Sequence, residues 1–265
     1  MFPAMTPTSP APSALTDGRV QLSVADGIGT VEFFHPKGNS LPSALLRELA
    51  AGITSLGNNP DARVIVLRSA GEGAFCAGAS FDEFTAVATP EQGQDFFSGF
   101  ARVILAMVRA PKFVITRVHG RAAGGALGVI AASDYSFATE GAQAKLSELQ
   151  VGIGPFVVGV VLERKLGPAP FMNLAVHADW HDAQWCERHG LYSQVVDNTH
   201  ALDAIVQSFA QRLAGYNPEA MREMKRIFWR DIDDWEARMM ERAAMSGRMV
   251  LSDFTKAALD KFRAR

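Results

Sequence analysis

Alternating polar and apolar residues mark the start of the readable pattern in this chain. From Arg19 to Val24 every second residue is apolar, and a second run of this kind covers residues 30–34. A glycine-bearing segment, residues 26–29, separates the two runs. Since successive side chains of a strand point to opposite faces, the pattern predicts a β-hairpin.

After residue 40, apolar residues recur at the spacing of a helix. Leucine and isoleucine recur every three or four residues from Leu45 to Leu56, which predicts a helix that begins near Pro42 with Ser40 as its cap and ends at Gly57. A second helix is predicted over residues 96–107, before Pro111. Residues 63–68 and 112–118 are dense in β-branched residues and predict buried strands.

These elements form two units of the same kind, each a helix, an apolar strand and a glycine-rich segment. The glycine-rich segments are residues 70–80 and 120–128. Strands that alternate with helices indicate an α/β architecture.

The pattern changes near residue 199, where strand signals stop. Helical periodicity covers residues 201–214, 218–229, 234–249 and 253–262. The apolar faces of these helices must pack either on the core or on another subunit. We therefore divide the chain into a flexible proline-rich tail (1–15), an α/β core (16–198) and a helical C-terminal region (199–265).

Composition narrows the class of protein. The chain has 265 residues, a net charge of −2 and two cysteines, Cys76 and Cys186. This charge gives no basic surface for nucleic acid or an anionic membrane, and two cysteines cannot form a disulfide scaffold. No apolar stretch reaches the ~20 residues of a membrane-spanning helix, and the N-terminus lacks a secretory signal. We expect a cytoplasmic protein without nucleic-acid or membrane partners.

The sequence lacks complete versions of several well-known nucleotide-binding, hydrolase and metal-binding motifs. Residues 73–80 (GAFCAGAS) have the glycine and serine spacing of a phosphate-binding loop, but Ala79 stands where the lysine is needed. No G-x-G-x-x-G follows a strand, and no G-x-S-x-G occurs. His177 and His181 are four residues apart, yet a helix break between them argues against a shared metal. Asp82 and Glu83 precede a helix, where acids usually complement the helix dipole in a solvated position.

Three segments remain: residues 71–79 (GEGAFCAGA), 118–128 (VHGRAAGGALG) and 142–155 (AQAKLSELQVGIGP), the last containing Glu148. Each alone is more typical of a turn or a surface carboxylate than of a site. Their order and spacing resemble the enoyl-CoA hydratase/isomerase (crotonase) family, over roughly residues 18–265. AFCAGAS is similar to the family's A-F-x-A-G-A-D, and VHGRAAGGALG to its V-N-G-x-A-x-G-G-G.

The resemblance implies a fold: a spiral of ββα turns followed by a helical C-terminal region that builds trimers, often paired as hexamers. It also implies an acyl-CoA thioester as substrate, with coenzyme A as part of that substrate and no metal or redox cofactor. The reaction would pass through an enolate whose oxygen is stabilised by two main-chain N–H groups.

By position, the resemblance assigns those two N–H groups to Ala79 and Gly125 and the catalytic carboxylate to Glu148. The substrate-binding positions would be Ala79, Ser80, Phe81, Asp82, Gly124 and Gly125. Lys37 is a candidate for the phosphates by position alone. Phe96, Phe97 and Phe100 could line an acyl tunnel, although aromatic residues at helical spacing more often belong to a core.

Three positions depart from the family pattern. Gly128 stands where hydratases carry a first glutamate, Ser80 replaces an aspartate, and His119 replaces an asparagine. A single carboxylate can move a proton between C2 and C4 without a water nucleophile. The sequence therefore favours Δ3 to Δ2 double-bond isomerisation. Hydration of a 2-enoyl-CoA and a non-catalytic acyl-CoA-binding relative are the alternatives.

Overall fold

A mainly parallel sheet of six strands forms the centre of this computed structural model, which describes residues 18–263. Its strands lie in the order β1 (Arg19–Ala25), β2 (Ile28–Phe34), β3 (Val64–Ser69), β4 (Val114–Val118), β6 (Tyr135–Thr139) and β8 (Gln194–Val196). β1 and β2 form the predicted hairpin, and every other neighbouring pair in this sheet is parallel. The predicted α/β class is confirmed. The predicted tail, residues 1–15, lies outside the described residues.

A second, much shorter ladder runs beside the main sheet. It contains β5 (Ala122–Ala123), β7 (Ala144–Lys145) and the single bridges Leu41–Ala79, Cys76–Ala122 and Ala144–His181. After each of β2, β3, β4 and β6 the chain passes once through this ladder and then enters a helical segment. The fold is therefore a spiral in which each turn adds a long strand, a short one and a helix.

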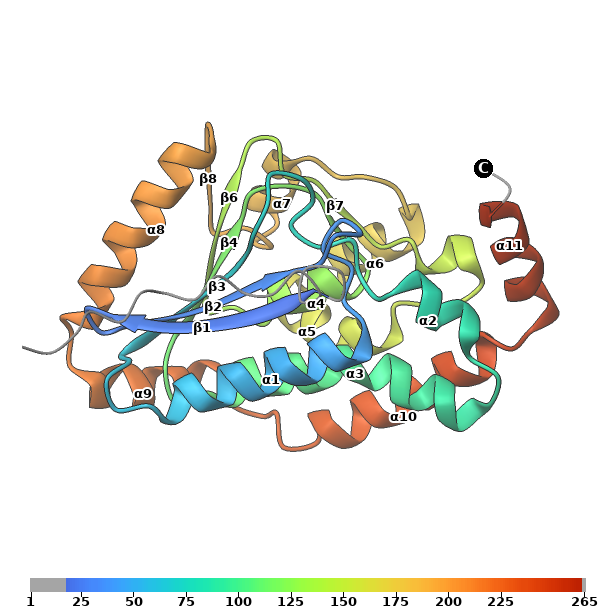
Figure 1. Cartoon of the computed structure of the whole chain (residues 1–265), viewed down its shortest axis with the longest axis horizontal. Coiled ribbons are helices and arrows are strands. Elements are labelled where there is room, and N and C mark those ends of the chain that lie inside the picture. Colours follow the sequence, from blue (N-terminus) through green and yellow to red (C-terminus); the bar gives the residue numbers. More distant parts are fainter. Residues whose placement is uncertain (1–17, 264–265) are drawn as a thin grey trace, which may run out of the picture.

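The two faces of the main sheet carry separate hydrophobic cores, as the alternation in β3 shows. Val64 and Val66 pack in the cluster that contains Leu202 and Val206 of α8 (Thr199–Ala214). Ile65 and Leu67 point the other way, into the larger core with α1 (Ser43–Asn58) and α3 (Pro90–Arg109). Figure 1 shows α8 on one side of the sheet and α1 and α3 on the other.

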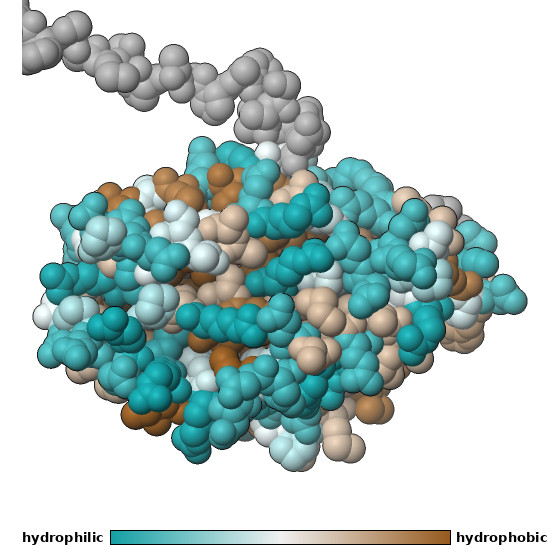
Figure 2. Space-filling model, turned by 90° about the horizontal axis from the view of Figure 1, so that it is seen from below, coloured by the Kyte–Doolittle hydropathy of each residue, from teal (hydrophilic) through white to brown (hydrophobic). Residues whose placement is uncertain are grey.

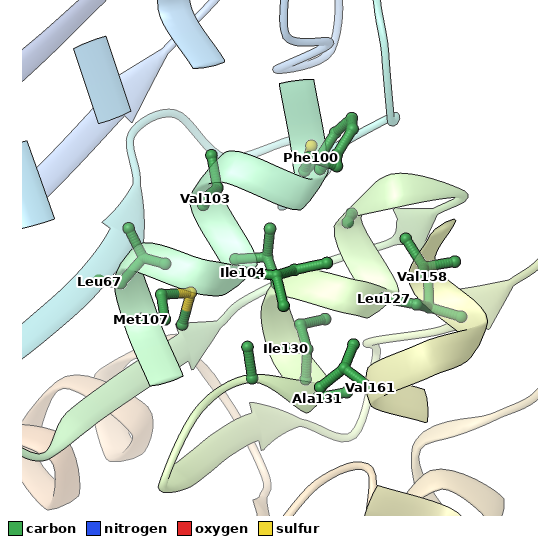
Figure 3. Packing of buried hydrophobic residues seen from close by; sticks show 14 of the residues in the cluster. Leu67, Phe100, Val103, Ile104, Met107, Leu127, Ile130, Ala131, Val158 and Val161 are labelled. Atoms are coloured by element: carbon green, nitrogen blue, oxygen red, sulfur yellow. The ribbon is translucent and has the colours of Figure 1, made fainter. Parts of the chain in front are cut away.

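The larger core continues through α4 (Gly125–Ala131) and α5 (Phe156–Leu166). Figure 3 shows aliphatic side chains from α3, α4 and α5 meeting there. The remaining helical segments are α2 (Phe81–Ala86), η2 (Glu148–Val151, a 3-10 turn), α6 (Pro168–His177), α7 (Ala183–Arg188), α9 (Pro218–Phe228), α10 (Trp235–Met249) and α11 (Asp253–Arg263).

The start of α1 differs from the prediction. Pro42, not Ser40, precedes the helix and offers no side-chain cap, and Ser40 is buried with its Oγ 3.3 Å from His35 Nδ1. The capping acceptor comes from far along the chain: Glu83 Oε2 accepts from Ser43 N at 2.9 Å and from Ser43 Oγ at 2.6 Å. Glu83 is therefore partly buried and bonded, contrary to the solvated role predicted for it, while Asp82 and Glu83 do lie in the first turn of α2.

Two glycines let α10 lie directly on α3. A Cβ at Gly93 would come 2.5 Å from the Cα of Gly247, and a Cβ at Gly247 would come 2.6 Å from the amide nitrogen of Gln94. The helix backbones touch here with no side chain between them. α10 is thereby held against the core, and Figure 2 shows the outer face that α1, α3, α9 and α10 form, where hydrophobic residues are scattered among hydrophilic ones.

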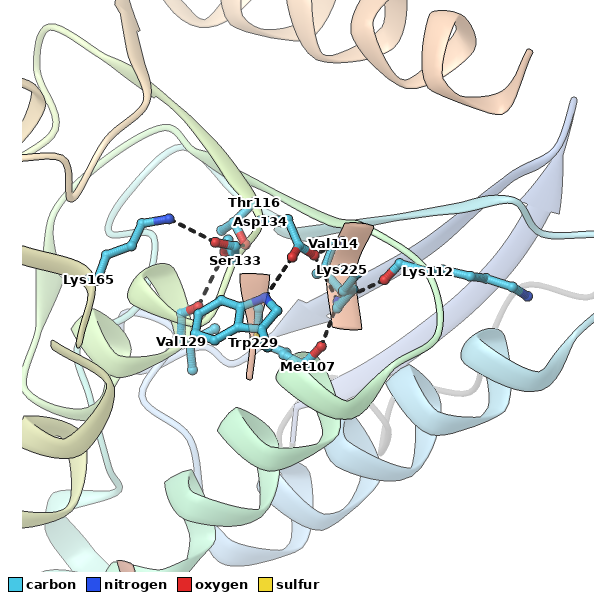
Figure 4. Close-up of polar contacts among 10 residues, drawn as sticks. All are labelled: Met107, Lys112, Val114, Thr116, Val129, Ser133, Asp134, Lys165, Lys225 and Trp229. Atoms are coloured by element: carbon cyan, nitrogen blue, oxygen red, sulfur yellow. Dashed lines mark hydrogen bonds and ion pairs between the residues drawn. The ribbon is translucent and has the colours of Figure 1, made fainter. Parts of the chain in front are cut away.

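A buried ion pair ties α9 to the core. Lys225 is 2% exposed, and its Nζ donates to the carbonyl oxygens of Met107 and Lys112 and to Asp134 Oδ2, each at 2.8 Å. Asp134 also accepts from Trp229 Nε1 at 2.7 Å. These contacts, drawn in Figure 4, give both charges hydrogen-bond partners where water is excluded.

The predicted helix break between His177 and His181 is present. α6 ends at His177, Ala178 has a left-handed conformation, and α7 begins only at Ala183. Within residues 18–263, no group of three or more histidines, cysteines, aspartates or glutamates is placed to hold a metal. No helix of the same part of the chain is long and apolar enough to cross a membrane.

Candidate active site

A cavity of about 420 Å³ lies where the short ladder meets α2, α3 and α5. Ala79, Gly124, Gly125 and Glu148, which come from three different turns of the spiral, all line it. Phe81 and Asp82 line it as well. The cavity thus brings together Ala79 and Glu148, which lie about 70 positions apart in the sequence.

The ladder explains why Ala79 and Gly125 share one cavity. Cys76 bridges Ala122 in parallel, and Ala123 N donates to Cys76 O at 3.0 Å, so the two glycine-rich segments run side by side. Ser80 N and Gly124 N are both used, donating to Leu41 O and Lys145 O. Among the described residues, neither the N–H of Ala79 nor that of Gly125 donates to a protein group. Both amides are therefore available to an acceptor in the cavity.

Glycine is required at residues 124 and 125 for two different reasons. Gly124 has φ of +54°, which L side chains rarely adopt, and a Cβ there would lie 3.4 Å from Glu148 Oε1. Gly125 has a clash instead, because a Cβ would come 2.3 Å from Cδ2 of Phe100. The backbone is bare at this point, which leaves the amide of Gly125 open to close approach.

Glu148 is a half-buried residue whose carboxylate oxygen Oε2 is buried and unsatisfied. It opens η2 in the middle of the third segment, and its Oε2 has no hydrogen-bond partner among the described residues. Desolvation by burial raises the pKa of Glu148 from 4.5 to about 7, with backbone hydrogen bonds at Glu148 and Ser147 acting in the opposite direction. A carboxyl with this pKa can both take and return a proton near neutral pH.

The three departures from the family pattern lie outside the cavity lining. Gly128 is in the core, where a Cβ would come 2.6 Å from Val158 Cγ1 and 2.8 Å from Ile104 Cδ1, so a glutamate does not fit. The Ser80 hydroxyl accepts from Glu83 N at 3.4 Å and caps α2. The His119 ring nitrogens have no partners in the described chain, and desolvation lowers its pKa to about 4.

The mouth of the cavity carries an exposed ion pair. Lys37 and Asp82 form a salt bridge there with their side chains 67% and 70% exposed. The hydrogen bond from Lys37 is the main cause that holds the pKa of Asp82 below its usual value. Lys37 is thus at the rim, but it already has a carboxylate partner.

Phenylalanines supply much of the remaining wall. Phe96, Phe97 and Phe100 line the cavity. Phe96 and Phe100 are also buried core residues, so the two roles predicted for them, in the cavity wall and in the core, both apply. Sequence reasoning missed Phe84, Phe156 and Ser246. Phe84 could have been found from its place four residues after the cap Ser80. Ser246 carries no signal, because only the crossing of α10 on α3 brings it to the cavity.

Comparison with known proteins identifies the family of this chain and its fold. The sequence model of the enoyl-CoA hydratase/isomerase family matches residues 23–262. The chain is 28% identical over 194 residues to carnitinyl-CoA dehydratase of Proteus mirabilis (73% of each chain). It is 31% identical over 191 residues to the mitochondrial methylglutaconyl-CoA hydratase of Rattus norvegicus (71% of this chain, 60% of that protein).

A solved enoyl-CoA hydratase from Bacillus halodurans has the same fold, with a TM-score of 0.85 at 17% identity over 91% of this chain and 99% of that one. The chain belongs to the enoyl-CoA hydratase/isomerase family, and its spiral of ββα turns is the crotonase fold. Family members act on acyl-CoA substrates, and this chain is an enzyme of that kind.

Proposed function

We propose that this protein is an enoyl-CoA isomerase that moves a double bond from C3 to C2 of an acyl-CoA thioester, with Glu148 as the proton shuttle. The supporting observation is one buried, unpartnered carboxylate in the same apolar cavity as two free main-chain N–H groups. The substrate is the acyl-CoA itself, so no separate cofactor is part of the proposal.

The proposed reaction is a balanced 1,3-proton transfer. The ionised Glu148 carboxylate removes a proton from C2 of the 3-enoyl thioester, and the electron pair of that C–H bond moves onto the thioester oxygen. The N–H groups of Ala79 and Gly125 donate hydrogen bonds to this oxyanion. Glu148 then returns the proton to C4, the double bond forms between C2 and C3, and the carboxylate is regenerated.

Hydration is the second candidate, because the relatives named above are a hydratase and a dehydratase. A two-carboxylate hydratase site needs a second acid to hold the attacking water. Gly128, the position of that acid in the family pattern, is buried against Val158 and Ile104. Among the described residues that line the cavity, Asp82 is the one carboxylate besides Glu148, and it is exposed and paired with Lys37. We therefore rank isomerisation first.

The decisive test compares wild type, Glu148→Gln and the matched exposed control Glu163→Gln. With hex-3-enoyl-CoA we expect wild type and Glu163→Gln to form hex-2-enoyl-CoA, and Glu148→Gln to lose at least about 100-fold in kcat. Binding of hexanoyl-CoA should persist in all three. Hydration of crotonyl-CoA faster than isomerisation would establish the second candidate, and binding without turnover on either substrate would indicate a non-catalytic acyl-CoA-binding protein.

We also propose a homotrimer, alone or paired as a hexamer, in the cytoplasm. Met172 and Val176 on α6 are 62% and 72% exposed, and Phe254 on α11 is 69% exposed, which favours coverage by another subunit. Light scattering after size exclusion should give three or six times the chain mass of 28.6 kDa. A monomer at micromolar concentration would contradict this.

A further inference from the structure

Aromatic rings dominate the cavity wall. Six phenylalanines line it, from α2, α3 and α5: Phe81, Phe84, Phe96, Phe97, Phe100 and Phe156. Phe84, Phe96 and Phe97 form one cluster, with ring centroids 5.1, 5.9 and 6.0 Å apart. Phe97 meets its two neighbours edge to face, at 82° and 83°.

The protein holds this cluster from behind. Phe84 and Phe96 are 8% and 6% exposed and pack with Ile153, Val250 and Leu259. Phe97 is only half-buried and faces the cavity. The rings are therefore fixed in place rather than free to collapse into the open volume.

The interior of the cavity offers little to a negatively charged acyl group. Of the described residues that line the cavity, the charged ones are Lys37, Asp82 and Glu148. Lys37 is at the rim and paired, and Glu148 would repel a second carboxylate. The Ser246 hydroxyl already donates to Arg242 O of its own helix at 3.3 Å. A buried carboxylate on the acyl group would therefore lack a cationic partner among the described lining residues.

We infer that the acyl group carries an aromatic ring and no negative charge. This inference rests on the proposed function, since it takes an acyl-CoA thioester as the ligand. Aromatic pairs prefer edge-to-face or offset arrangements with centroids 4.5–7 Å apart, and they gain stability beyond the area that they bury. A ring placed beside Phe97 obtains such contacts, whereas a linear chain obtains area burial alone.

Binding of saturated, unreactive thioesters tests the inference independently of the reaction. The acyl groups compared by calorimetry are 4-phenylbutanoyl, 4-cyclohexylbutanoyl and decanoyl, which have the same number of carbons. Adipoyl-CoA and 4-trimethylammoniobutanoyl-CoA add a carboxylate and a quaternary ammonium, the cation that aromatic rings also attract. We expect the phenyl thioester to bind about tenfold more tightly than decanoyl-CoA, and ahead of all the others.

Two variants attribute the preference to the ring cluster. Phe97→Leu should reduce the phenyl preference to about threefold or less while decanoyl-CoA binds as before. The control Phe209→Leu removes a ring from the Tyr135–Phe137–Phe209 cluster on the opposite face of the sheet, and it should keep the wild-type ranking.

The inference is overturned if cyclohexyl or decanoyl thioester binds as tightly as the phenyl one, or if either charged acyl group ranks first. Failure of the proposed function gives different results. A phenyl-first ranking without isomerisation would contradict the isomerase alone, and no binding by any thioester would contradict both proposals.

Discussion

At the residue scale, Glu148 combines burial with an oxygen that no described group satisfies. Burial costs the charged form free energy, and the pKa near 7 reports that cost. The ionised Glu148 side chain that is suited to proton transfer therefore lowers the free energy of unfolding. Activity and stability are both expected to change over the pH range in which this carboxyl ionises.

The first prediction concerns stability against pH. The folded pKa of Glu148 is about 7 and its ordinary value is 4.5, so from pH 4.5 upward the unfolded chain loses its proton first and stability falls until about pH 7. At about 1.4 kcal/mol for each pKa unit, the loss is about 3 kcal/mol. Glu148→Gln should be more stable than wild type by about that amount at pH 8, and equal to it near pH 4. Urea unfolding at both pH values measures this, and a difference independent of pH would contradict it.

The second prediction concerns Gly125→Ala. The added Cβ would overlap the ring of Phe100, so the start of α4 must move and take the Gly125 amide with it. We expect kcat to fall about 100-fold and stability to drop by about 1–3 kcal/mol. Steady-state kinetics and thermal unfolding check both effects. Gly73→Ala is the control, because its Cβ meets nothing within 4 Å, and equal behaviour of the two variants would refute the packing argument.

At the element scale, sequence patterns predicted the elements that carry a period or a dense run of β-branched residues. The β1–β2 hairpin, α1, α3 and the helices after residue 199 show a period, while β3 and β4 are buried along almost their whole length and were predicted from their β-branched residues. α5 shows no such period, since most of its residues are apolar and buried, which leaves no polar face to reveal a helical repeat. The candidate site was grouped by family resemblance, while its phenylalanine wall depends on how α2, α3 and α5 pack and could not be predicted from spacing.

The third prediction tests the contact between α3 and α10. A Cβ at Gly93 meets the backbone of Gly247, which cannot rotate away as a side chain could. Gly93→Ala should therefore separate the two helices, lower stability by about 2–4 kcal/mol and weaken acyl-CoA binding through the displaced Ser246. Chemical denaturation and calorimetry measure the two effects. Gly141→Ala is the control, because its Cβ would meet no atom within 4 Å, and it should change neither stability nor binding. A Gly93→Ala variant with wild-type stability and binding would disprove the close contact.

At the scale of the whole molecule, a buried ion pair joins residues that are far apart in the sequence. Lys225 bonds to Asp134 and to two carbonyl oxygens from the α3–β4 region, so α9 is fastened to the core by a charge that water does not reach. Removing one member of such a pair leaves the other charge buried and uncompensated.

The fourth prediction follows from that pair. Lys225→Met should lower the free energy of unfolding by about 3–5 kcal/mol, because Asp134 stays buried without its partner. Lys256→Met, which changes an exposed lysine of α11, should have little effect. Urea denaturation compares the two. A Lys225→Met variant as stable as wild type would mean that α9 is held by its apolar contacts alone.

The last helix also touches the catalytic turn. A Cβ at Gly152, just after η2, would come 2.5 Å from Thr255 Oγ1, and Leu259 packs behind the phenylalanine cluster. The cavity lining contains no described residue of α11, so this helix supports the site from outside. A chain that stops before Thr255 would keep Glu148 and both glycine-rich loops, more than 100 residues earlier, and would lose the packing that backs the catalytic turn.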